Sequence, residues 1–177
     1  MSYLPDLIAG LMNELKSYFT GISGMAIYDT DLQDDITAIF PLCVLEVNEA
    51  PESARLPGNG LTRMDYSISL RVYAYEPNAY NANDGDYSTG LLQIIDDLRV
   101  YFQNEVYQTT QMQALSTNYG FRLTYKGTSK AEAIQIAEKI CKGFTLNFET
   151  IGFDSATRAT VDFPDTNQNV SGNVVFD

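Results

Sequence analysis

The stretch from Leu61 to Tyr75 alternates apolar and polar residues, and this pattern restricts the fold more than any other in the chain. The apolar residues occupy even-numbered positions: Met64, Tyr66, Ile68, Leu70, Val72 and Ala74. On the odd-numbered side, the polar residues Asp65, Ser67, Ser69 and Arg71 are followed by Tyr73 and Tyr75, which give that side an aromatic end. A period of two is typical of a strand with one buried and one solvated face. A slip of one residue would turn the apolar row outward, so we predict a central strand of firmly set register.

Apolar residues recur at steps of three and four in residues 4–19 and 89–105, which predicts two amphipathic helices. Residues 106–119 are polar and are predicted to be irregular. Further strands are predicted from alternation or from a continuous apolar run, at residues 25–28, 36–49, 121–125 and 144–148.

Residues 130–142 are predicted to form a third helix. Ser129 and Glu132 fit a capping box, and Gly143 stands where a helix commonly ends. The alternation of Ile134 and Ile136 leaves an extended conformation open as the alternative. The predicted fold class is α+β, with an antiparallel or mixed sheet of about four to five strands packed by two to three helices. Residues 1–153 form the predicted domain, and residues 154–177 form a polar C-terminal tail or arm.

The chain is strongly acidic, with 11 Lys and Arg against 23 Asp and Glu and a net charge of −12. A protein that grips nucleic-acid phosphates needs a basic footprint, so direct phosphate binding is not expected. The simpler interpretation of the charge is solubility. No run approaches the roughly 18 apolar residues of a membrane span, so no membrane partner is expected. Cys43 and Cys141 are interpreted as buried apolar side chains of a soluble protein in a reducing, intracellular setting.

Catalytic signals are weak in this sequence. There is no histidine, the commonest general base at neutral pH. The aspartates at 29, 31, 34 and 35 suggest a calcium loop, but the positions that need Gly and Glu hold Asp34 and Phe40. We interpret them as a solvated turn, and we predict no catalytic residue, cofactor or metal. An enzyme built on two distant carboxylates is the alternative class.

Two segments are candidates for contact with partners. The 50–60 loop has two prolines and two glycines and carries Arg55 and Leu56 at its middle. The chain ends with the apolar Val174, Val175 and Phe176, which could add as a strand to the sheet edge of another subunit. The simpler interpretations are a connector and a frayed terminus.

The order of these elements resembles that of the tail terminator, or tail completion, proteins of tailed bacteriophages. An amphipathic helix precedes a strand entered through Phe40-Pro41 and a long hairpin loop. The long alternating strand then ends in Arg71-Val-Tyr-Ala-Tyr, and a helix with Leu91-Leu-Gln-Ile-Ile-Asp-Asp-Leu follows. The strand at 121–125 and the closing Gly143-Phe-Thr-Leu-Asn-Phe complete the order. The resemblance covers residues 4–150, and the polar tail departs from it.

The resemblance implies a structural virion protein, not an enzyme, assembled in the host cytoplasm. Its expected assembly is a hexameric ring that caps the tail tube and joins it to the head connector. The tube protein and the connector or neck protein would be its partners, and DNA would pass through the ring without specific binding. Interface residues are expected on the solvated side of the 61–75 strand, at Arg71, Tyr73 and Tyr75. The alternatives are another neck or head–tail joining protein, or a generic protein-binding module.

Overall fold

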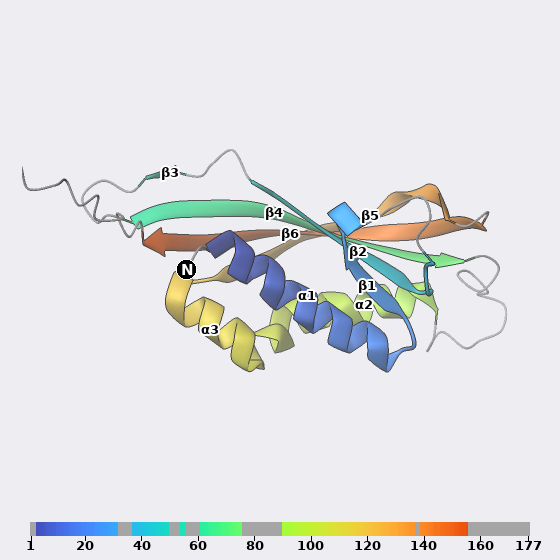
Figure 1. The fold of residues 1–177 in the computed structure, drawn as a ribbon, viewed down its shortest axis with the longest axis horizontal. Coiled ribbons are helices and arrows are strands. Elements are labelled where there is room, and N and C mark those ends of the chain that lie inside the picture. The colour runs from blue at the N-terminus through green and yellow to red at the C-terminus, as the bar shows by residue number, and fades with distance from the viewer. Residues whose placement is uncertain are drawn as a thin grey trace, which may run out of the picture.

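The computed structural model describes residues 3–31, 37–49, 54–55, 61–75, 90–136 and 139–155. These residues form one mixed sheet with helices on one side of it, an α+β fold as predicted (Figure 1). The helical elements in chain order are α1 (Tyr3–Gly21), η1 (Asp29–Asp31), α2 (Leu91–Val100), η2 (Tyr101–Glu105), η3 (Val106–Gln108) and α3 (Thr110–Tyr119). The strands are β1 (Met25–Tyr28), β2 (Leu42–Glu49), β3 (Ala54–Arg55), β4 (Leu61–Tyr75), β5 (Arg122–Ile136) and β6 (Lys139–Ser155).

The strand order is β1-β2-β4-β6-β5, and the two-residue β3 also pairs with β4. β1 and β2 are parallel, and the other pairs are antiparallel. The predicted central strand is confirmed, because all 15 residues of β4 pair with β6 and its other edge pairs with β2. The prediction of its buried side is also confirmed, since Tyr66, Ile68, Leu70 and Val72 are at most 4% exposed.

The core lies between the helices and this side of the sheet. α1 contributes the stripe predicted from the sequence, with Leu7, Leu11, Leu15 and Phe19 all inaccessible to solvent. Cys43 is buried in the same core, as predicted, and its burial raises the pKa of the thiol. The start of α1 is held to the end of the sheet by a 2.9 Å hydrogen bond between the hydroxyls of Tyr3 and Thr150.

The prediction of a helix at residues 130–142 is wrong. Residues 122–155 form the two long strands β5 and β6, which pair antiparallel. The alternative extended conformation is the correct one, since Ile134 lies opposite Cys141 in a small apolar cluster. Gly143 does not end a helix. It lies within β6, where an added Cβ would be 2.4 Å from the carbonyl oxygen of Val72 and 2.7 Å from the Tyr73 ring.

The prediction that residues 106–119 are irregular is also wrong, because they form η3 and α3. The Thr109 side chain caps α3 by accepting a hydrogen bond from the backbone N–H of Met112. Gly120 ends the helix with φ of 62°, in the left-handed region. The predicted helix at 89–105 divides into α2 and the single π-helical turn η2.

The predicted strand at 36–49 is shorter in the structure. β2 begins at Leu42, where its pairing with β1 and β4 begins, and residues 37–41 lie outside any strand. Pro41 has no N–H to donate to a ladder, which explains its place immediately before the strand.

We expect Gly152→Ala to destabilise the fold by about 1–3 kcal/mol, as overpacked core substitutions do. An added Cβ at Gly152 would lie 2.2 Å from Cζ of Tyr3. The Tyr3 ring is 1% exposed and packs against the rings of Tyr66 and Tyr119, so it has little room to move. Urea unfolding would measure the loss. Gly21→Ala is the control, because no atom of the described residues lies within 4 Å of its added Cβ; equal losses in the two variants would contradict this account.

Alkaline pH should destabilise the protein through its tyrosines. Burial, followed by the charge of Asp97, raises the pKa of Tyr18 to about 12. An unfolded tyrosine has a pKa near 10. Because the folded-state pKa is the higher one, stability is complete below about pH 10 and is lost as the pH rises towards 12. Urea unfolding across this range should show a shallower decline for Tyr18→Phe than for the wild type, and identical slopes would refute the assignment.

Candidate functional site

The face of the sheet opposite the helices is the candidate functional site, and we call it the open face. The strand register places Glu46, Ser69 and Asn147 in one row across β2, β4 and β6. Arg71 lies in the next row, opposite Val44 on β2 and Thr145 on β6. Residues directly opposite one another point to the same face, so this face combines polar groups from three strands.

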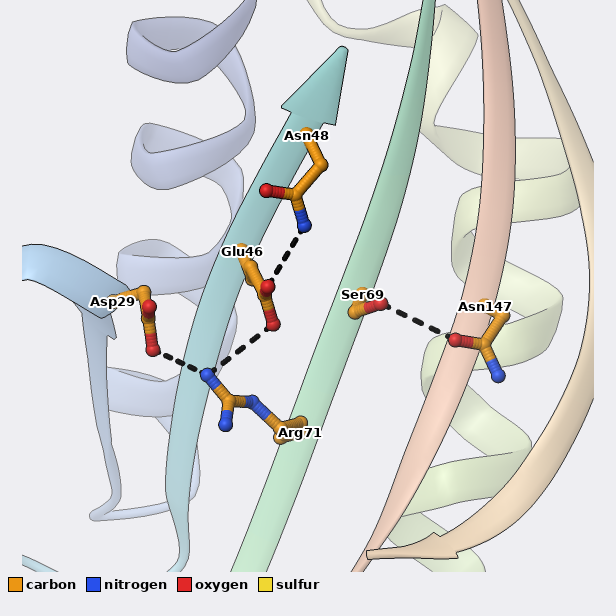
Figure 2. Close-up of polar contacts among 6 residues, drawn as sticks. All are labelled: Asp29, Glu46, Asn48, Ser69, Arg71 and Asn147. Carbon is orange, nitrogen blue, oxygen red and sulfur yellow. Dashed lines mark hydrogen bonds and ion pairs between the residues drawn. The ribbon is translucent and has the colours of Figure 1, made fainter. Parts of the chain in front are cut away.

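Arg71 is the centre of the charged contacts on the open face (Figure 2). Its guanidinium pairs with Asp29, from η1, and lies 3.3 Å from an Oε2 oxygen of Glu46. Asn48 donates a 2.7 Å hydrogen bond from Nδ2 to the other carboxylate oxygen of Glu46. Nε of Arg71 is buried and has no hydrogen-bond partner among the described residues. One guanidinium therefore joins two carboxylates, and the three side chains together carry a net negative charge.

The neighbouring polar contact on this face is neutral. The hydroxyl of Ser69 donates a 3.2 Å hydrogen bond to the side-chain oxygen of Asn147, across the β4–β6 pair (Figure 2). Both side chains are half-buried in this single chain. Hydroxyl and amide groups at this depth can exchange hydrogen bonds with a covering surface without leaving a charge buried.

Tyr73 does not provide the exposed aromatic end that the alternating pattern predicted. Its side chain is 2% exposed and packs with Ile27, Leu42, Val44 and Cys141 in a second apolar cluster. Burial raises the pKa of its hydroxyl. The odd-numbered side of β4 is therefore apolar near Tyr73 and polar from Arg71 towards Ser67. The prediction that Cys141 is buried is confirmed.

The remaining predicted interface residues are not brought into this site by the described structure. Only the backbone of Arg55 is described, in β3, and only that of Tyr75, at the end of β4. Leu56, Val174, Val175 and Phe176 lie outside the described residues. Of the predicted set, Arg71 and Tyr73 share the open face, and the first is half-buried while the second is buried.

Sequence reasoning missed Asp29, Glu46 and Asn147. The run of aspartates predicts a solvated turn at Asp29, and Asp34 and Asp35 of that run lie outside the described residues. No local signal connects these three residues, because their proximity depends on the register of three strands. The alternation of β2 and β6 could have placed Glu46 and Asn147 on one face, but not opposite the same residue of β4.

A hollow of about 290 Å³ lies between α2 and β5. It is lined by Leu92, Ile95, Asp96, Arg99, Tyr125 and Thr128. Asp96 and Arg99 form an exposed ion pair of 2.5 Å, and Tyr125 and Thr128 share a 2.6 Å hydroxyl–hydroxyl hydrogen bond. The polar side chains that line the hollow are thus already paired with each other and are solvated. An exposed ion pair of this kind contributes little energy, so the hollow is a weaker candidate than the open face.

Within the part of the chain that the structure describes, no three His, Cys, Asp or Glu side chains gather as metal ligands. None of the described helices is long and apolar enough to cross a membrane.

Searches of protein-family models and of curated proteins found no match to this chain.

Replacing Arg71 by Met should lower the free energy of unfolding by about 1 kcal/mol at low salt, since Asp29 and Glu46 would then repel each other across a partly solvated gap. The loss should shrink as salt screens that repulsion. Urea unfolding at several salt concentrations measures it. Arg99→Met is the matched control, because its ion pair is more exposed, at 42% and 57% of the two side chains. A loss that is independent of salt, or equal in both variants, would contradict the role given to Arg71.

Proposed function

We propose that this protein is a tail terminator of a tailed bacteriophage, a structural virion protein. Copies of the chain form a ring, which caps the tail tube and joins it to the head connector. The role is assembly and not catalysis, and the open face and the sheet edges supply the contacts.

The observation that carries the proposal is the two-sided character of the sheet. Helices cover one side, and on the other side the described chain leaves Glu46, Ser69 and Asn147 half-buried without a covering element. Half-buried polar groups in fixed register suit a surface that a neighbouring protein covers, because each already has a defined hydrogen-bond direction. The order of elements around this sheet is the order that resembles the tail terminator family.

The acidic charge fits the same proposal. DNA that passes through a ring must not adhere to its wall, and carboxylates repel phosphates at close range. At physiological salt this repulsion falls off beyond about 8 Å, so only groups near the bore act on DNA. The chain's charge of −12 is multiplied by the number of copies in the ring.

The purified full-length chain should form closed rings, with the mass of six 19.7-kDa chains. Sedimentation velocity gives the mass over a concentration series, and negative-stain images show the central hole. Fluorescence anisotropy with duplex DNA should show no binding at physiological salt, because the assembly lacks the basic footprint that phosphate binding needs. A chain that stays monomeric at every concentration, and that also fails to bind the ends of tail tubes, would overturn the proposal.

A further inference from the structure

The charges of this acidic protein are unevenly placed along the chain. Residues 122–142, which we call the basic hairpin, contain five basic and two acidic residues, a net charge of +3. The remainder contains six basic and 21 acidic residues, a net charge of −15. The five bases of the hairpin are Arg122, Lys126, Lys130, Lys139 and Lys142.

The basic hairpin forms one lateral edge of the sheet. β5 is the last strand in the order, and Arg122, Lys126 and Lys130 on it are exposed. Lys126 pairs with the exposed Glu149 of β6 at 2.5 Å, while Arg122 and Lys130 keep the edge basic.

The opposite lateral edge of the sheet is acidic. β1 is the first strand in the order, and η1 follows it directly with Asp29 and the exposed Asp31. Glu46 lies beside them on β2, and Arg71 neutralises one of these three charges. We call Asp29, Asp31 and Glu46 the acidic edge.

The bases on β5 are too far from Asp29 and Asp31, which follow β1, for these charges to neutralise each other within one copy. Four strand spacings separate β1 from β5, which is about 19 Å at 4.8 Å per spacing. This distance is more than twice the screening length of about 8 Å at physiological salt. Opposite charges at the two ends of one sheet can therefore meet only when a second copy approaches.

We propose that the basic hairpin of one copy docks on the acidic edge of the next copy, and that this contact builds the ring. This inference rests on the proposed function and names the surfaces that it uses. A contact between two different surfaces is heterologous, which is the type that generates closed rings. The occupant is a second copy, because the same chain carries both complementary surfaces.

The contact is made by side chains and not by addition of a strand. The register of β5 shifts between Tyr125 and Gly127 and again between Ala131 and Ile134. Such bulges, together with lysines along an edge strand, interrupt the regular row of backbone groups that another strand would need. Ion pairs tolerate this irregularity because lysine and arginine side chains are long and adaptable.

Sedimentation velocity of the full-length chain tests the docking. Lys130→Glu and Asp31→Lys should each lower the association constant between copies roughly tenfold, because each replaces an exposed attraction by a repulsion. An equimolar mixture of the two variants should recover assembly, since each altered edge then meets an oppositely altered edge in an alternating ring. Wild-type assembly should weaken as the salt concentration rises.

Two controls match the change in net charge at exposed positions on the helices, outside the basic hairpin and the acidic edge. Lys16→Glu on α1 matches Lys130→Glu, and Asp97→Lys on α2 matches Asp31→Lys. Both controls should assemble as the wild type does. If the wild type assembles and Lys130→Glu behaves like Lys16→Glu, or if the mixture recovers nothing, the docking is overturned while the ring stands. If the wild type does not assemble at all, the docking is overturned, and the proposed function falls with it when the chain also fails to bind the ends of tail tubes.

Discussion

The pairing of β4 along both of its edges is the constraint on which the rest of the structure depends. β6 pairs with all of its 15 residues and β2 with eight of them, so the register of β4 fixes the positions of three strands together. With that register set, one side of the sheet presents Ile68, Leu70 and Val72 to the helices. The other side brings Arg71 to Glu46 and Ser69 to Asn147. The same backbone pairing of β4 therefore positions both the core residues on one side of the sheet and the candidate site on the other.

Elements with a clear period could be predicted from the sequence. The predicted bounds of α1, β1 and β4 agree with the structure within a few residues. Their apolar patterns arise from burial on one face, and the structure buries those residues. The α+β class followed from them. α3 was missed because its exposed residues are polar, although Thr109, Gly120 and the buried Met112 and Leu115 are ordinary helix signals.

The error at residues 130–142 has a different physical origin. Ser129, Glu132 and Gly143 are helix signals that act within a few residues, whereas β5 is held by β6 and β6 by β4. Long-range pairing overrides local propensity when a whole strand is bonded on its inner edge. The candidate site could not be predicted for a related reason. Arg71 was identified from the strand pattern, but its partners Asp29 and Glu46 follow only from knowing which strands are neighbours.

The tie between Tyr3 and the last strand has a consequence for synthesis of the chain. The hydroxyls of Tyr3 and Thr150 share a hydrogen bond. The Tyr3 ring also occupies the space that a side chain at position 152 would need. Tyr3 and Thr150 are 147 residues apart, so the start of α1 reaches its final contacts only after β6 has been synthesised. Contacts of such sequence separation slow folding. Until β6 is present, the start of α1 lacks this contact, while the rest of its apolar stripe can already pack against β1, β2 and α3.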